Sequence, residues 1–152
     1  MKKVIFSFLF VTLMCIGFLA CDKHESIIFT DLPSESQAFI QKYFPNVLVN
    51  EVEKYKEEPL YEVKLNNGFE LSFYGDGRWQ EIDGNRAILP ATLIQDVLPQ
   101  GILDYLAREY TNVGVTAVER SSAGYNIELS MTPTITLYFD PSGDVLIDWE
   151  QD

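Results

Sequence analysis

The chain contains 152 residues, of which 47% are hydrophobic and 13% aromatic, so it can bury the core of one domain or of two small halves. It carries 23 acidic residues against 11 basic ones, which gives a formal net charge of −12 at pH 7. This balance excludes binding to a nucleic-acid backbone as the main role, because such binding depends on Lys and Arg side chains that neutralise phosphates.

The first residues resemble a bacterial lipoprotein signal. Two lysines precede a continuous apolar tract at residues 4–20, and Cys21 follows directly after the small residue that ends this tract. A basic start, an apolar stretch and a small residue at the cut are the parts of a secretory signal peptide. The resemblance implies that residues 1–20 are removed and that fatty acids such as palmitate acylate Cys21. The protein would then be a lipid-anchored component of a Gram-negative cell envelope, facing the periplasm or lying on the cell surface.

Two alternatives stay open for this segment. The tract could be an uncleaved membrane helix, although its length lies at the short end of what spans a bilayer. Cys21 could also be an ordinary thiol after a plain cleavage site. If the lipoprotein interpretation holds, Cys15 leaves with the signal and the mature chain has no disulfide. Losing two lysines also moves the net charge from −12 to −14. We expect residues 21–30 to be a short tether without secondary structure.

Beyond the signal, the sequence repeats at an offset of 66 residues. The offset pairs Leu32-Pro33 with Leu98-Pro99, Phe44 with Tyr110, Asn46-Val47 with Asn112-Val113, Val52-Glu53 with Val118-Glu119, and Gly77 with Gly143. Between these matches the register slips by two, where Tyr61 matches Tyr125, and then recovers. The repeat predicts a first unit at residues 31–86, a packed apolar link at 87–97 and a second unit at 98–152. We expect the units to form one compact domain.

Each unit is predicted to contain one helix followed by four strands. In the first unit, Pro33 and the capping-box spacing of Ser34 and Gln37 predict where the helix begins, and Pro45 predicts where it ends. In the second unit, apolar residues at helical spacing from Ile102 to Tyr110 predict the equivalent helix. The predicted strands are residues 47–54, 61–65, 69–74 and 78–82, then 113–119, 125–130, 134–139 and 145–149.

Alternation along these strands predicts the fold class. Tyr61, Val63 and Leu65 face one way, whereas Glu62 and Lys64 face the other, and the later strands follow the same pattern. One apolar and one polar face are typical of an antiparallel sheet that is packed on one side and solvated on the other. The expected fold is therefore α+β, with the helices packed on one face of the sheet and the other face open.

The order of these motifs resembles the PepSY-like, β-lactamase-inhibitor-like family of exported bacterial proteins. The residues that carry the resemblance are Leu32-Pro33, Tyr43-Phe44-Pro45, Gly75-Asp76-Gly77-Arg78-Trp79, Ile88-Leu89-Pro90-Ala91-Thr92, Leu98-Pro99, Tyr105-Leu106, Tyr110 and Tyr125-Asn126-Ile127-Glu128-Leu129. The resemblance covers nearly all of residues 30–150. It implies two helix-plus-four-strand units with a broad sheet, and a role in binding or restraining a protein partner. Inhibition of a β-lactamase is an analogy of fold alone.

The sequence offers no catalytic constellation, and we expect no enzymatic activity, no cofactor and no metal site. The one histidine, His24, lies in the expected tether, so a histidine-based triad is absent. No free cysteine remains after acylation for nucleophilic chemistry, and zinc ligation would require a His/Cys cluster. The turn at residues 140–144 lacks the length and pattern of a calcium loop.

The open sheet face is the predicted binding site for an envelope protein or peptide. The residues proposed for it are Glu62, Lys64, Glu70, Ser72 and Tyr74, with Trp79 at the rim. Exposed Tyr and Trp are favoured in protein interfaces, although Trp79 and Trp149 could instead complete the core at a sheet edge. The acidic balance fits a basic partner surface, or simple solubility. A small-molecule or glycan binder and a structural envelope component are the alternative functions.

Overall fold

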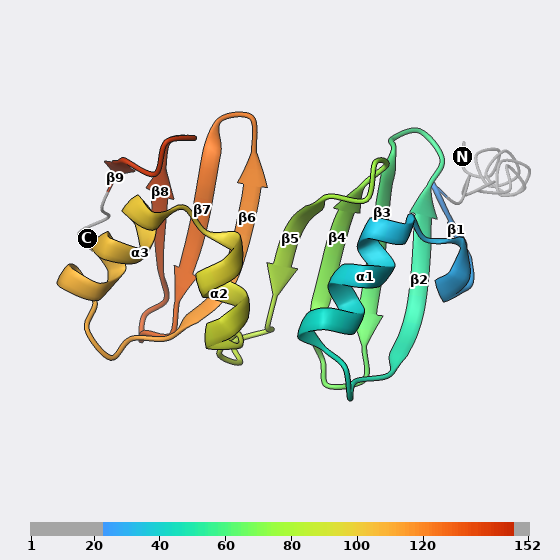
Figure 1. Cartoon of the computed structure of the whole chain (residues 1–152), viewed down its shortest axis with the longest axis horizontal. Coiled ribbons are helices and arrows are strands. Elements are labelled where there is room, and N and C mark those ends of the chain that lie inside the picture. The colour runs from blue at the N-terminus through green and yellow to red at the C-terminus, as the bar shows by residue number, and fades with distance from the viewer. Residues whose placement is uncertain (1–22, 148–152) are drawn as a thin grey trace, which may run out of the picture.

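The computed structural model describes residues 23–147, which form one antiparallel sheet with its α-helices on one face (Figure 1). Nine strands follow one another across the sheet in chain order. They are β1 His24–Ser26, β2 Val49–Tyr55, β3 Leu60–Leu65, β4 Glu70–Tyr74, β5 Trp79–Asp83, β6 Val115–Ser121, β7 Gly124–Leu129, β8 Ile135–Phe139 and β9 Val145–Ile147. The helices are the 3-10 turn η1 Phe29–Asp31 and the α-helices α1 Ser34–Tyr43, α2 Ala91–Val97 and α3 Gln100–Glu109. The predicted signal, Cys21 and Trp149 lie outside the described residues.

Two units of the same build make up the sheet, which confirms the predicted α+β fold. An offset of 66 residues relates both ends of α1 to those of α3, and both ends of β2 to those of β6. The ends of β3 and β7 are Leu65 and Leu129, so the predicted slip of two residues lies here as well. The pairing of Val63 with Leu71 in the first unit recurs as Ile127 with Leu137 in the second.

The helix of the first unit begins at Ser34, one residue after Pro33, as the proline predicts. The predicted capping box is wrong, because Pro33 occupies the N-cap and no side chain caps the helix. Gln37 instead donates from Nε2 to the carbonyl oxygen of Leu32 at 2.8 Å. Ser36 is fully buried and donates from Oγ to the carbonyl oxygen of Gly77 at 3.1 Å, which holds the β4–β5 hairpin against the helix.

The expectation that the tether at residues 21–30 has no secondary structure is also wrong, because β1 lies within it and η1 begins in it. Residues 24–26 form β1, which pairs with β2 through His24 opposite Tyr55 and Ser26 opposite Glu53. Three polar residues show no strand periodicity. This strand forms because the edge of β2 offers unpaired backbone N–H and C=O groups. The link at 87–97 does pack on the core, since Leu89 and Leu93 are buried, but most of it forms the unpredicted helix α2.

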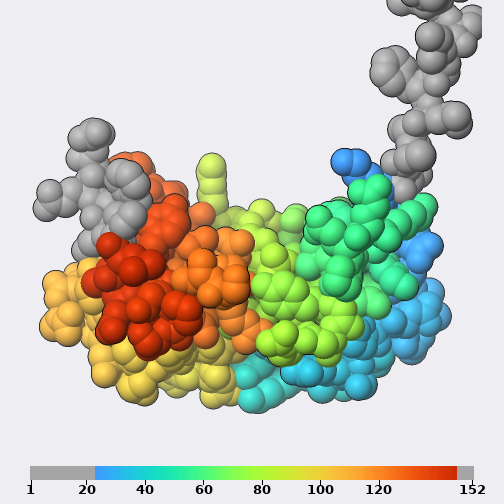
Figure 2. All heavy atoms as spheres, turned by 90° about the horizontal axis from the view of Figure 1, so that it is seen from above, coloured from blue at the N-terminus to red at the C-terminus, as the bar shows by residue number. Residues whose placement is uncertain are grey.

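The two units share one core between the sheet and the helices. Its buried side chains form a single cluster with contributions from both units. Strand β5 of the first unit pairs directly with β6 of the second, where Ile82 lies opposite Val118, and both are fully buried. The opposite face of the sheet is not covered by helices. Figure 2 shows this uncovered side, at the top of the view, as a hollow between two raised ends.

Candidate binding face

Cross-strand pairing arranges the open face in two rows that run across both units. Row 1 passes from β1 to β8 through directly opposed residues. It consists of Ser26, Glu53, Glu62, Ser72, Glu81, Glu119, Asn126 and Tyr138. Row 2 passes from β2 to β8 and consists of Glu51, Lys64, Glu70, Asp83, Ala117, Glu128 and Thr136. Neighbouring strands lie about 4.8 Å apart, so each row is a nearly continuous line of side chains.

The two rows are strongly acidic. Row 1 holds Glu53, Glu62, Glu81 and Glu119, and row 2 holds Glu51, Glu70, Asp83 and Glu128. Lys64 is the one Lys or Arg within these two rows, and its Nζ lies 2.9 Å from Glu51 Oε2. The hydrogen bond to Glu51 and the attraction of Glu53 and Glu62 raise the pKa of Lys64. The face therefore presents far more negative than positive charge.

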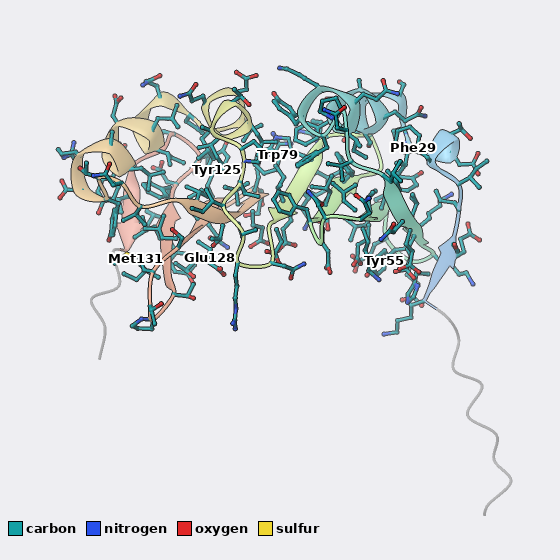
Figure 3. All side chains as sticks on the ribbon, turned by 90° about the horizontal axis from the view of Figure 1, so that it is seen from below. Phe29, Tyr55, Trp79, Tyr125, Glu128 and Met131 are labelled. Carbon is teal, nitrogen blue, oxygen red and sulfur yellow. The ribbon has the colours of Figure 1, made fainter. Side chains whose placement is uncertain are left out.

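A cavity of about 260 Å³ lies on this face in the first unit. Its walls are Tyr55, Leu60, Glu62, Glu70, Ser72, Gln80, Glu81 and Asp83. Tyr55 donates from its hydroxyl to Glu62 Oε2 at 2.9 Å, and this bond raises the pKa of Tyr55. Figure 3 shows Tyr55 and Glu128 on the side of the sheet away from the helices. We call this cavity the acidic pocket.

Glu81 is a carboxylate of the acidic pocket whose surroundings raise its pKa. It is half-buried, and it accepts no hydrogen bond from the described residues 23–147. Burial raises its pKa first, and Glu119, Asp83, Glu62 and Glu70 add to the shift by repulsion. Glu119 lies directly opposite Glu81 across the junction of the two units. Like charges at directly opposed positions destabilise a sheet.

Replacing Glu81 with glutamine is expected to raise the free energy of unfolding at pH 7 by about 0.5–1 kcal/mol, because it removes this repulsion. The raised pKa means that the folded state binds a proton at higher pH than the unfolded state, whose pKa is near 4.5. The contribution of Glu81 to wild-type stability therefore rises as the pH falls from the raised pKa toward about 4.5, and the advantage of the variant disappears there. Urea unfolding of both proteins across this range measures the difference.

Glu58→Gln is the matched control for this effect, because Glu58 is exposed in the β2–β3 connection. Its unfolding free energy should follow that of the wild type at every pH. An advantage of Glu81→Gln that stayed constant down to the lowest pH would contradict the assigned repulsion.

The structure brings together most of the predicted site residues. Glu62, Glu70 and Ser72 line the acidic pocket, and Lys64 lies beside it in row 2. Tyr74 reaches across the junction, because its hydroxyl donates to the carbonyl oxygen of Arg120 in the second unit at 2.8 Å. Tyr74 therefore lies on the open face of the sheet and also links the two units through this hydrogen bond.

Trp79 is not at the rim of this face. It is 7% exposed, and Figure 3 shows it with Tyr125 on the helix side of the sheet. Arg120 stacks over the indole with its Cζ 4.3 Å from the ring centroid, and it also donates to the carbonyl oxygen of Trp79. The physical reason is a bulge: Ser72 pairs with Glu81 but Phe73 pairs with Trp79, so Gln80 is an extra residue. The bulge shifts the alternation and turns Trp79 inward.

Further acidic residues of the face come from β5 of the first unit and from β6 and β7 of the second unit. Glu81, Asp83, Glu119 and Glu128 belong to the rows but were not among the predicted residues. Their polar positions in alternating strands were visible in the sequence. The alignment of Glu119 and Glu128 with the first unit was not visible, because it depends on the pairing of β5 with β6.

Other kinds of site find no support in residues 23–147. No group of three or more His, Cys, Asp or Glu in this range is placed to hold a metal ion. No helix in the same range is long and apolar enough to cross a membrane. His24 of β1 contacts the neighbouring strand β2, with its Nδ1 2.9 Å from Glu53 Oε1.

Three solved structures from Bacteroides share this architecture. The first, from Bacteroides vulgatus, is described as a "putative periplasmic protein of unknown function"; it is 28% identical, with a TM-score of 0.73 over 84% of this chain and 99% of that one. The second, a "putative periplasmic protein" of the same species, is 26% identical, with a TM-score of 0.74 over 85% and 98%. The third, from Bacteroides thetaiotaomicron, is described as a "putative calcium-regulated periplasmic protein"; it is 25% identical, with a TM-score of 0.76 over 86% and 99%.

A family model matches most of the chain. Among curated proteins, none matches the chain. The model of one family matches twice, at residues 19–74 and 59–147, and this family is described as "Putative beta-lactamase-inhibitor-like, PepSY-like". The two matches overlap in β3 and β4 of the first unit, and together they cover most of the chain. The chain therefore belongs to the PepSY-like, β-lactamase-inhibitor-like family.

Proposed function

We propose that this protein is a non-enzymatic component of the cell envelope that binds a cationic segment of a protein or peptide on its open sheet face. The observation that carries the proposal is the pair of acidic rows. Each row holds four carboxylates, and Lys64 in row 2 is the one lysine or arginine in either row. Charge complementarity of this kind directs the approach of a partner and selects against partners of the wrong sign.

The position of the charges supports a binding role over simple solubility. Solubility needs only scattered surface charge, whereas Glu81 and Glu119 lie directly opposite each other at the junction, where burial and the repulsion of Glu119 raise the pKa of Glu81. A sheet selected for stability alone would alternate the charges there. Residues that reduce stability are common where binding requires them. A Lys or Arg side chain of a partner would relieve this repulsion.

The location of the protein is part of the proposal. The three Bacteroides relatives are described as periplasmic, which supports an envelope location for this chain. The lipoprotein signal adds an acylated Cys21. Only Asp22 and Lys23 separate that residue from β1, so the anchor would hold the sheet edge close to the membrane. Partners would then be envelope proteins or peptides.

We do not extend to this chain the calcium regulation named in the description of the Bacteroides thetaiotaomicron relative. Four carboxylates line the acidic pocket, but no group of three in residues 23–147 has the placement of a metal site. A small neutral ligand is also disfavoured, because the cavity lies at the low end of ligand-site volumes and its walls are charged.

Titration with short synthetic peptides tests the proposal. A lysine-alanine peptide should bind, a glutamate-alanine peptide of the same length should not, and the affinity should fall as salt rises and screens the charges. The double variant Glu81→Gln/Glu119→Gln should bind the lysine peptide about tenfold more weakly, since two partly exposed ion pairs of up to about 1 kcal/mol each are lost. Its stability should not fall, which separates loss of binding from loss of folding.

The matched control removes two carboxylates from the helix side of the sheet. Glu35 lies in α1 and Glu109 in α3, and both are exposed. Glu35→Gln/Glu109→Gln changes the net charge equally and should leave the affinity within about twofold of the wild type. Equal weakening by both double variants, or no binding of the lysine peptide at low salt, would overturn the proposed site.

A further inference from the structure

One cation stands at the edge of this acidic face without an ion-pair partner. Arg86 follows β5 in the connection to α2, and it is exposed. It takes part in none of the ion pairs or cation–π contacts among residues 23–147. In Figure 2 a yellow-green projection, in the colour of this connection, stands alone out of the hollow.

The backbone that presents Arg86 is firmly held but unfavourable for an arginine. Ala87 donates to the carbonyl oxygen of Gly84 at 2.9 Å, and between them Asn85 and Arg86 have φ values of 50° and 74°. Such a turn favours Asn and Gly at its two central positions. Asn85 satisfies this preference, whereas Arg86 does not. The chain therefore keeps an arginine where glycine would be less strained.

The turn is tied to both units. Gly84 donates to the carbonyl oxygen of Thr116 in the second unit at 2.8 Å. Asn85 donates from Nδ2 to the carbonyl oxygen of Gly68 in the first unit at 2.5 Å, and to Glu70 Oε1 at 3.4 Å. Glu70 lines the acidic pocket, so Asn85 contacts a wall of that pocket, and Arg86 is the next residue in the chain.

On its other side, Arg86 borders a second cavity of about 390 Å³ in the second unit. Its walls are Arg86, Thr116, Glu128, Leu129, Ser130, Met131, Thr132, Pro133 and Thr134. Figure 3 shows Glu128 and Met131 on the open side of the sheet. The carboxylate of Glu128 already has a partner in this cavity, because its Oε1 accepts a hydrogen bond from Thr116 Oγ1 at 2.9 Å. We call this cavity the rim pocket.

We propose that Arg86 is a specificity contact that pairs with a carboxylate of the bound segment and thereby sets its direction. This inference rests on the proposed function. The cationic end of the segment lies over the acidic pocket, and an acidic group next to it lies at the rim pocket. Arginine suits this role because its guanidinium binds a carboxylate through two parallel hydrogen bonds.

A pair of charge-patterned peptides tests the direction. Both have a lysine-rich end; the other end carries aspartates in the first peptide and asparagines in the second. The wild-type protein should bind the aspartate peptide about threefold to fivefold more tightly at low salt, as expected for one exposed ion pair. Arg86→Gln should remove this preference, whereas Arg86→Lys should keep part of it, and Lys56→Gln, an exposed charge loss in the β2–β3 connection, should keep all of it.

The outcomes separate this inference from the proposed function. If both peptides bind the wild type equally, Arg86 has no partner and the inference is overturned, while the acidic face stands. A uniform gain in affinity of Arg86→Gln for both peptides means that the arginine only weakens the negative field, which also overturns it. If neither peptide binds the wild type, the proposed function and the inference are both overturned. Arg86→Gly should unfold at higher temperature yet lose the preference, which rules out misfolding as the cause of the loss.

Discussion

Replacing Ile82 with alanine is expected to lower the free energy of unfolding by about 2–5 kcal/mol, the usual loss for a buried isoleucine. Ile82 is fully buried in β5 and lies between Leu71 of the first unit and Val118 of the second. The cavity would therefore open at the junction, where the two units share one core. Calorimetry should show one transition at a lower temperature.

Ile28→Ala makes the same chemical change at a residue that is 67% exposed, and it should alter stability by less than about 0.5 kcal/mol. A calorimetric trace of Ile82→Ala that split into two transitions, with one unshifted, would contradict the single cooperative unit. In that case the duplicated halves would be separate domains joined by β5 and β6.

Replacing Gly124 with alanine is expected to lower the free energy of unfolding by about 3 kcal/mol or more, a large share of the stability of an ordinary domain. Gly124 begins β7 with a φ of 134°, and a Cβ built on it would lie only 1.9 Å from the carbonyl oxygen of Phe139. This neighbour is backbone of the adjacent strand β8, so it cannot rotate away as a side chain would. Denaturant unfolding measures the loss.

Gly68→Ala separates the effect of the clash from that of the backbone angle. Gly68 has a φ of 88°, but a Cβ there would meet no atom within 4 Å. It should cost only the strain of a left-handed residue, about 1–2 kcal/mol. Similar losses for the two variants would show that the close approach of β8 to Gly124 is not what restricts this position.

Much of the fold could be predicted from local patterns. The offset of 66 residues, Pro33 before the first helix and the alternating strands predicted both units, and most element ends lie within two residues of the prediction. Where local pattern was weak, prediction failed: β1 contains only His24, Glu25 and Ser26, and it exists because β2 offers it an edge. Trp79 was misplaced because a bulge at Gln80 reverses the alternation, and bulges have no clear signature in one sequence.

The candidate site divides in the same way. Glu62, Glu70 and Ser72 could be placed on one face because alternation within β3 and β4 is a local property. Their continuation to Glu119 could not, since it depends on the register between β5 and β6, which belong to different units.

By itself, the sequence determined the repeated unit, its helix and strands, and the existence of a polar open face, because side-chain periodicity and turn residues act over a few positions. The tertiary structure alone decided that the two units join edge to edge through β5 and β6. That junction aligns carboxylates from both units into rows and places Glu81 opposite Glu119, and Arg86 borders a cavity with Glu128. The physical reason is that strand pairing is a long-range choice, made by the shared core around Ile82 and Val118 rather than by any local pattern.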